Sequence, residues 1–101
     1  MDLNYIRGFF DRLCSVDEAN RAIVLTTTNV DLGRLVGARI RREGITCHIN
    51  NLDDRVKLRV SGRESLERWA SLVGFEDQGK TDKLRRILAS YGGTDADGSA
   101  A

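Results

Sequence analysis

Residues 5–16 of the chain read Tyr5-Ile6-Arg7-Gly8-Phe9-Phe10-Asp11-Arg12-Leu13-Cys14-Ser15-Val16. The stretch has an apolar helix pattern that ends in an acid, followed by a segment typical of a strand, so it predicts a helix, a turn and a strand. Asp2 can begin this helix, because its carboxylate can accept the free backbone N–H groups of the first turn. The helix is apolar over most of its circumference. This indicates burial on two sides, against its own sheet and against a second copy of the chain.

The middle of the chain predicts two hairpins separated by a helix. Residues 21–28 are rich in β-branched side chains and predict a strand, with residues 15–17 as its partner across a turn at 18–20. Asn29 and Gly44 are expected to begin and end a second helix. Its expected apolar stripe is Leu32, Leu35, Val36 and Ile40. Residues 45–50 and 56–60 alternate between apolar and polar side chains, so they predict two strands that each have one buried apolar face and one solvent-exposed polar face.

Two more helices are predicted before the end of the chain. Ser61 and Glu64 have the spacing of a capping box and predict a third helix that ends at Gly74. Its expected buried side chains are Leu66, Trp69, Ala70 and Val73. Residues 81–91 predict a fourth helix, and the small polar residues 92–101 predict a disordered tail. The element order implies one α+β domain over residues 1–91, a four-stranded antiparallel sheet with helices on one face.

Composition excludes several classes of protein and leaves others open. The 101 residues are 41% hydrophobic and 31% charged, which is typical of a single globular domain. No apolar run approaches the ~20 residues that span a bilayer, so we expect no membrane partner and a cytoplasmic protein. The two cysteines, Cys14 and Cys47, are expected to be reduced and packed as small hydrophobic residues. The net charge of +1 does not by itself indicate a nucleic-acid binder, although basic residues cluster locally.

Residues 5–16 resemble the signature helix of the LAGLIDADG homing endonucleases, which often reads Tyr-Ile-Arg-Gly-Phe-Phe-Asp-Gly-Asp-Gly-Ser-Val. Two later segments are similar to the family as well: residues 59–66, at its strand-to-helix passage, and Gly74-Phe75 followed by Lys80 and Leu84. The resemblance implies the αββαββα fold of one family half domain, whose sheet forms a saddle. One motif implies one half, so we expect a homodimer. Its interface would be formed by Tyr5, Gly8, Phe9 and Arg12.

The resemblance also implies that the solvent-exposed polar faces of the strands bind double-stranded DNA. A two-stranded ribbon fits the major groove, and alternating side chains can direct hydrogen-bond donors at base edges. The expected DNA-binding residues are Thr26, Thr28, Thr46, His48, Asn50, Lys57 and Arg59. Without the resemblance, the same pattern is also typical of an ordinary solvated face. His48 is the only histidine in the chain, so a histidine-based metal site is not expected.

The chain departs from the family where the resemblance places cleavage chemistry. Metal-assisted cleavage needs hard oxygen ligands, and the family's metal-binding acid falls on Leu13, which cannot bind a metal. Arg12 and Cys14 replace small residues, and Arg12 brings bulk and charge to the expected helix interface. Asp11 and Lys80 would remain as remnants of the site, with Asp11 chiefly structural. We therefore expect no catalytic residues, no metal and no cofactor, with Mg²⁺ as the cofactor if the protein is active after all.

Three functions remain open at this point. The first is a LAGLIDADG-like homodimer that binds duplex DNA and has lost cleavage. The second is a structural or protein-interaction dimer derived from the same fold. The third is an active homing endonuclease, or one half of a heterodimeric enzyme.

Overall fold

The computed structural model describes residues 1–92, and residues 93–101 of the predicted tail lie outside the described residues. The elements follow in the predicted order of helix, two strands, helix, two strands and two helices. They are α1 (Leu3–Leu13), β1 (Cys14–Asp17), β2 (Ala22–Thr27), α2 (Val30–Arg42), β3 (Cys47–Asn51), β4 (Val56–Ser61), α3 (Arg63–Leu72) and α4 (Gln78–Gly92). The fold is thus the predicted α+β class.

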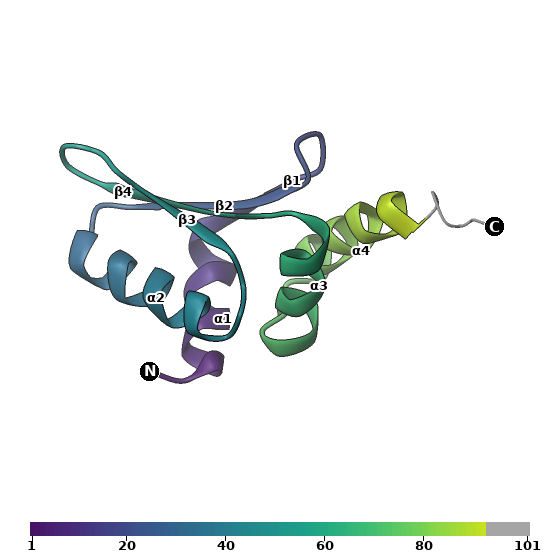
Figure 1. Ribbon diagram of the computed structural model, residues 1–101, viewed down its shortest axis with the longest axis horizontal. Coiled ribbons are helices and arrows are strands. Elements are labelled where there is room, and N and C mark those ends of the chain that lie inside the picture. The colour runs from purple at the N-terminus through teal and green to yellow at the C-terminus, as the bar shows by residue number, and fades with distance from the viewer. Residues whose placement is uncertain (93–101) are drawn as a thin grey trace.

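The four strands form one antiparallel sheet in the order β1-β2-β4-β3. The hairpins β1–β2 and β3–β4 therefore meet through their second strands, which pair along their whole length. Figure 1 shows the helices of residues 1–92 gathered on one side of this sheet, with α1 beneath its centre and none of them on the opposite face. This arrangement confirms the predicted sheet with helices on one face, and it leaves one face of all four strands open.

The core lies between the sheet and the helices. Phe10 of α1 and Trp69 of α3 are fully buried, and their ring centroids are 4.5 Å apart. The sheet contributes the side chains that alternate toward the helices, and the central strands provide Ile23, Leu25, Val56, Leu58 and Val60, all fully buried. Burying apolar surface at about 25 cal/mol per Å² is the main stabilising contribution of such a layer. The core thus holds α1 and α3 against the central strands.

The first helix joins the sheet more directly than the sequence suggests. The Asp2 carboxylate accepts the backbone N–H of Tyr5 at 2.8 Å, which confirms the predicted cap. The helix continues past Asp11 to Leu13, and β1 begins at Cys14 without the predicted turn. Arg12 and Leu13 are good helix formers, whereas the glycines of the family pattern favour a turn. The substituted residues therefore extend α1 to the edge of the sheet.

Side chains close the predicted β1–β2 turn and form the predicted cap of α2. The Asp17 carboxylate accepts the backbone N–H of Asn20 at 3.1 Å and its side-chain amide at 2.7 Å, which closes the β1–β2 hairpin. Asn29 begins α2 by accepting the backbone N–H of Leu32 at 3.3 Å. These side chains satisfy backbone donors that would otherwise be unpaired.

The predicted apolar stripe of α2 is wrong at Leu35. This side chain is 61% exposed, whereas Val36 and Ile40 are fully buried. Gly33 and Gly37 are also buried and lie against the sheet. Glycines bring the helix backbone close to β4, so the inner face of α2 includes positions that a search for apolar side chains does not detect.

The start of α3 and one of its buried positions also differ from the prediction. Ser61 is the last residue of β4, and the helix is preceded by Gly62, whose φ of 91° favours glycine and which makes no side-chain cap. The Ser61–Glu64 capping box is therefore wrong. Ala70 is exposed instead of buried, although Leu66 and Trp69 are buried as predicted. The α3 stripe is narrower than the apolar pattern indicates.

Candidate functional site

The open face of the sheet carries two rows of side chains that cross the strands. In the first row, His48 of β3 lies opposite Arg59 of β4, and Arg59 lies opposite Val24 of β2. The second row is parallel to it and runs from Asn50 through Lys57 to Thr26. Antiparallel pairing places the side chains of directly opposed residues on the same face, about 5 Å apart. Five predicted DNA-binding residues therefore lie on one surface: Thr26, His48, Asn50, Lys57 and Arg59.

The other two predicted DNA-binding residues lie at the ends of the strands. Thr28 is exposed and follows β2, in the bend before α2. Thr46 is exposed and precedes β3, where its backbone N–H donates to the Ser65 hydroxyl at 2.9 Å. Both threonines flank the open face without belonging to its cross-strand rows.

The open face carries the positive charges of Lys57 and Arg59 and, at its β1 end, the negative charge of Asp17, which pairs with Ala22 two residues before Val24. The two cationic side chains are half-buried, and among residues 1–92 neither forms an ion pair within 4.0 Å. Asp17 is the nearby acid. Hydrogen bonds from Asn20 are the main cause that lowers the pKa of this carboxyl, and the charge of Arg59 adds to the effect. The cations on this face are therefore available to a bound anion, while Asp17 stays ionised within its turn.

The sequence prediction missed one central member of the open face, Val24. Residues 22–25 read Ala22, Ile23, Val24 and Leu25, an unbroken apolar run that does not reveal which side chains face outward. The register resolves this, because Val24 is opposite Arg59 whereas Ile23 and Leu25 are opposite the buried Val60 and Leu58. Ser15 of β1 completes the row on the far side of Val24.

Asp11 and Lys80, the predicted remnants of a cleavage site, are brought together below the sheet. The Asp11 carboxylate accepts the backbone N–H groups of Glu76 at 2.9 Å and Asp77 at 3.2 Å. The Lys80 ammonium donates to the backbone carbonyl of Asp11. These contacts join the end of α1 to the start of α4. Asp11 thus links two segments that are distant in the sequence.

Leu13 ends α1 and is 45% exposed, so its hydrocarbon side chain is accessible beside this junction. Within residues 1–92, no cluster of three or more His, Cys, Asp or Glu side chains could hold a metal ion.

The four predicted interface residues of α1 do not share one surface. Tyr5 is 47% exposed and Arg12 is exposed, whereas Phe9 is 3% exposed and belongs to the core. Phe9 is thus largely unavailable to a partner, because the chain's own sheet and helices cover it. Gly8 lies in between, and a methyl group added there would approach only the Arg12 guanidinium, at 4.0 Å. The accessible side of α1 is formed by Tyr5, Gly8 and Arg12.

Both cysteines are buried and carry free thiols, as the sequence predicts. Burial raises the pKa of Cys14 to about 11, although the positive charge of Lys80 opposes this effect. Burial likewise raises the pKa of Cys47 to about 11, opposed by Arg41. A thiol with so high a pKa is a poor nucleophile near neutral pH. Neither cysteine has the properties of a catalytic group.

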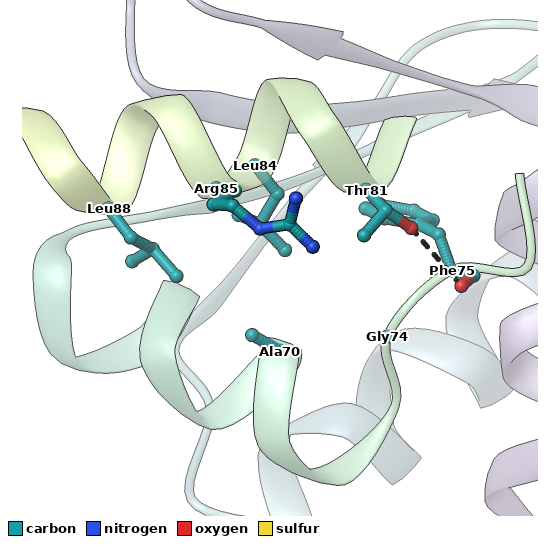
Figure 2. A pocket seen from close by; sticks show the side chains of 7 residues that line it. All are labelled: Ala70, Gly74, Phe75, Thr81, Leu84, Arg85 and Leu88. Atoms are coloured by element: carbon teal, nitrogen blue, oxygen red, sulfur yellow. Dashed lines mark hydrogen bonds between the residues drawn. The ribbon is translucent and has the colours of Figure 1, made fainter. Parts of the chain in front are cut away.

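A pocket of about 310 Å³ opens between α3 and α4. Figure 2 shows Leu84 and Leu88 of α4 facing Ala70 of α3 across the pocket, with the Arg85 side chain beside Leu84. The Thr81 hydroxyl donates to the Phe75 carbonyl at 3.3 Å. The lining contains no acid, histidine or cysteine, so the pocket offers apolar surface without acid–base chemistry.

Comparison with known proteins gives no family for this chain. No protein-family profile matches it. It is 27% identical over 84 residues to elongation factor 2 of Methanopyrus kandleri, a match that covers 83% of the chain. It is 29% identical over 89 residues to the replication factor C small subunit of Thermococcus kodakarensis, which covers 84% of the chain. The matched segments make up only 6% and 10% of those two proteins.

Among residues 1–92, no helix combines the length and the apolar character that crossing a bilayer requires.

Proposed function

We propose that this chain is a LAGLIDADG-like half domain that binds duplex DNA as a homodimer and does not cleave it. The observation that carries the proposal is the open sheet face, on which His48, Arg59, Asn50 and Lys57 stand in two adjacent cross-strand rows. None of the described helices covers this face, and among the described residues its two cations form no ion pair within 4.0 Å. Phosphate or base edges would provide the missing partners.

The donor types on this face suit the major groove. Arg59 can donate two hydrogen bonds to the O6 and N7 atoms of guanine, and Asn50 can pair with N6 and N7 of adenine. Lys57 can bind guanine or a phosphate oxygen, and His48 and Thr26 can add single hydrogen bonds. A curved antiparallel ribbon is a recognised way to bring such side chains into this groove. The proposed contact surface is therefore the open face, flanked by Thr28 and Thr46.

The accessible side of α1 supports the proposed homodimer. One domain has one signature helix, and Tyr5, Gly8 and Arg12 lie on the accessible side of that helix. A two-fold axis along α1 would place two saddle halves side by side, which predicts a nearly palindromic target.

The lack of cleavage follows from Leu13. The family position for a metal-binding carboxylate is occupied here by a hydrocarbon side chain, which cannot hold Mg²⁺ or position an attacking water. Asp11 cannot easily replace it, because its carboxylate accepts backbone N–H groups of Glu76 and Asp77. If the protein were nevertheless an active nuclease, or half of a heterodimeric one, Mg²⁺ would have to be held by acids from outside this position.

The comparisons are compatible with a domain that occurs inside larger proteins. Each match spans most of this chain but only a tenth or less of the matched protein, and the two matched proteins have different names. This is the pattern expected when one compact domain recurs in different protein contexts. The activities in those two names are not transferred to this chain.

A protein-interaction dimer is the second candidate, and one observation favours it. Exposed apolar side chains gather where the N-terminus meets α2: Met1 is 51% exposed, Leu35 is 61% exposed and Tyr5 is 47% exposed. Met1 borders both neighbouring hollows, one with Tyr5 and one with Leu35, so these side chains form one continuous area. Apolar surface of this kind is typical of contacts between proteins.

Binding of labelled duplexes, measured by fluorescence anisotropy over a series of salt concentrations, tests the DNA proposal. Affinity should fall steeply with salt, because bound phosphates release counterions. Lys57→Ala should reduce the salt slope by about one if Lys57 contacts a phosphate. Lys83→Ala, an exposed lysine on α4, is the matched control and should leave the slope unchanged. Absence of binding at low salt would favour the protein-interaction dimer instead.

A further inference from the structure

Val24 is an apolar side chain in the middle of an otherwise polar surface. It is half-buried and lies on β2, between Ser15 of β1 and Arg59 of β4. Among the described strands, the only other apolar open-face position is Ala22, which is fully buried. Val24 is therefore the one aliphatic group that a molecule resting on the open face would meet.

The neighbours of Val24 define what such a molecule would find around it. Arg59 is directly opposite, and Thr26 follows on the same strand and the same face. Directly opposed side chains are about 5 Å apart, which is between one and two of the ~3.4 Å steps that separate successive base pairs. A duplex seated on this face would thus place the two side chains over neighbouring base pairs.

We propose that Val24 recognises the 5-methyl group of a thymine that lies next to a guanine bound by Arg59. The inference rests on the proposed DNA binding and adds one specific contact to it. In the major groove, thymine is the only standard base with a methyl group, and an apolar side chain is its natural partner. A base edge that carries a donor or acceptor would lose its water hydrogen bond against Val24 without replacement. Val24 therefore selects thymine both by contact and by excluding the alternatives.

The target sequence can be found in the same experiment that tests the contact. Duplexes bound by the full chain are first selected from a random library, and each thymine of the best duplex is then replaced by uracil. Uracil keeps the base-pairing edge and removes only the methyl group. One thymine in each half-site should weaken binding about fourfold on replacement, the value expected for one buried methyl group.

Two variants then assign the methyl contact to a side chain. Val24→Ser removes both methyl groups of the side chain, so it should remove the difference between thymine and uracil. Thr26→Ser is the matched control on the same face and should keep that difference. The wild-type comparison needs no variant, so a variant that fails to fold does not prevent the test.

The outcomes separate this inference from the proposed function. DNA binding without any methyl-sensitive thymine would overturn the role of Val24 and leave the proposed function intact. A thymine preference that persists in Val24→Ser would also overturn it, since another group would then contact the methyl. If no duplex is bound, the proposed function fails and the Val24 inference fails with it.

Discussion

The carboxylate of Asp11, near the end of α1, accepts the backbone N–H of Glu76 at 2.9 Å. The same carboxylate accepts the backbone N–H of Asp77 at 3.2 Å, so one side chain fixes the loop that leads into α4. Lys80 reinforces this junction from α4 by donating to the Asp11 carbonyl. An acid that the sequence marks as a remnant of a cleavage site thus holds two distant segments together.

Asp11→Ala is expected to lower the free energy of unfolding by about 1–2 kcal/mol, because two backbone donors lose a charged acceptor. Urea denaturation followed by circular dichroism measures the change. Asp53→Ala, in the exposed β3–β4 turn, is the control and should change stability little. An unchanged urea midpoint for Asp11→Ala would mean that water replaces the carboxylate at no cost.

Gly33→Ala is expected to destabilise the protein by about 1–3 kcal/mol, the usual cost of overpacking. A methyl group at Gly33 would lie 2.4 Å from a Val56 methyl and 2.9 Å from a Thr27 methyl, and both side chains are β-branched and stiff. The helix would have to move away from β4. Thermal or urea unfolding measures the loss, and an unchanged stability would show that α2 shifts without cost.

Gly8→Ala on α1 is the counterpart of Gly33→Ala and is expected to have the opposite effect on the stability of the monomer. An added methyl group would meet no atom closer than 4.0 Å, so the monomer should gain up to about 1 kcal/mol of helix propensity. If α1 packs against its mate at Gly8, however, the same change should weaken the dimer. Analytical ultracentrifugation of wild type and variant separates the two effects. A wild-type chain that stays monomeric at all concentrations would contradict both dimer proposals.

The buried thiols predict a loss of stability at alkaline pH. The pKa of Cys14 and of Cys47 is raised by burial from the ordinary 9.0 to about 11, so the unfolded state ionises first. Their contribution to stability is therefore fully present below pH 9 and is lost as the pH rises toward 11, by up to about 1.4 kcal/mol per thiol for each pH unit. Urea denaturation midpoints, measured once below pH 9 and once halfway between pH 9 and pH 11, report this loss of stability. A Cys14→Ala, Cys47→Ala double variant should lack this part of the decline.

Leu13→Asp tests whether a missing ligand explains the proposed lack of cleavage. The 45% exposed position can accept a carboxylate without burying a charge. Wild-type protein with Mg²⁺ should leave supercoiled plasmid intact, whereas Leu13→Asp should nick it if the remaining groups are in place. Leu13→Asn, which has a similar shape but no charge, is the control. Sustained nicking by pure wild-type protein would contradict the proposed inactivity.

The sequence predicts the order and type of the elements well, because these depend on local patterns. Alternation places Val56, Leu58 and Val60 inside, and all three are fully buried. Capping by Asp2 and Asn29 is local in the same sense, and both caps are present. Such signals need only a few neighbouring residues.

What the sequence does not predict depends on contacts between distant segments. Leu35 is exposed because Gly33 and Gly37 occupy the side of α2 that faces the sheet. The outward direction of Val24 depends on its register with β4, which an unbroken apolar run does not reveal. Phe9 is expected at a dimer contact but lies in the core of one chain. Register and close backbone approach are properties of the assembled sheet.

The strand order has a consequence for how the chain folds. Each hairpin joins strands that are adjacent in the sequence, so each can close with a small loss of chain entropy. The β2–β4 pairing joins the two hairpins across the whole of α2, and it is therefore the slow, non-local step. Until that step, the apolar strand β2 has one unprotected edge. Conditions that delay it would leave this edge free to pair with other molecules and aggregate.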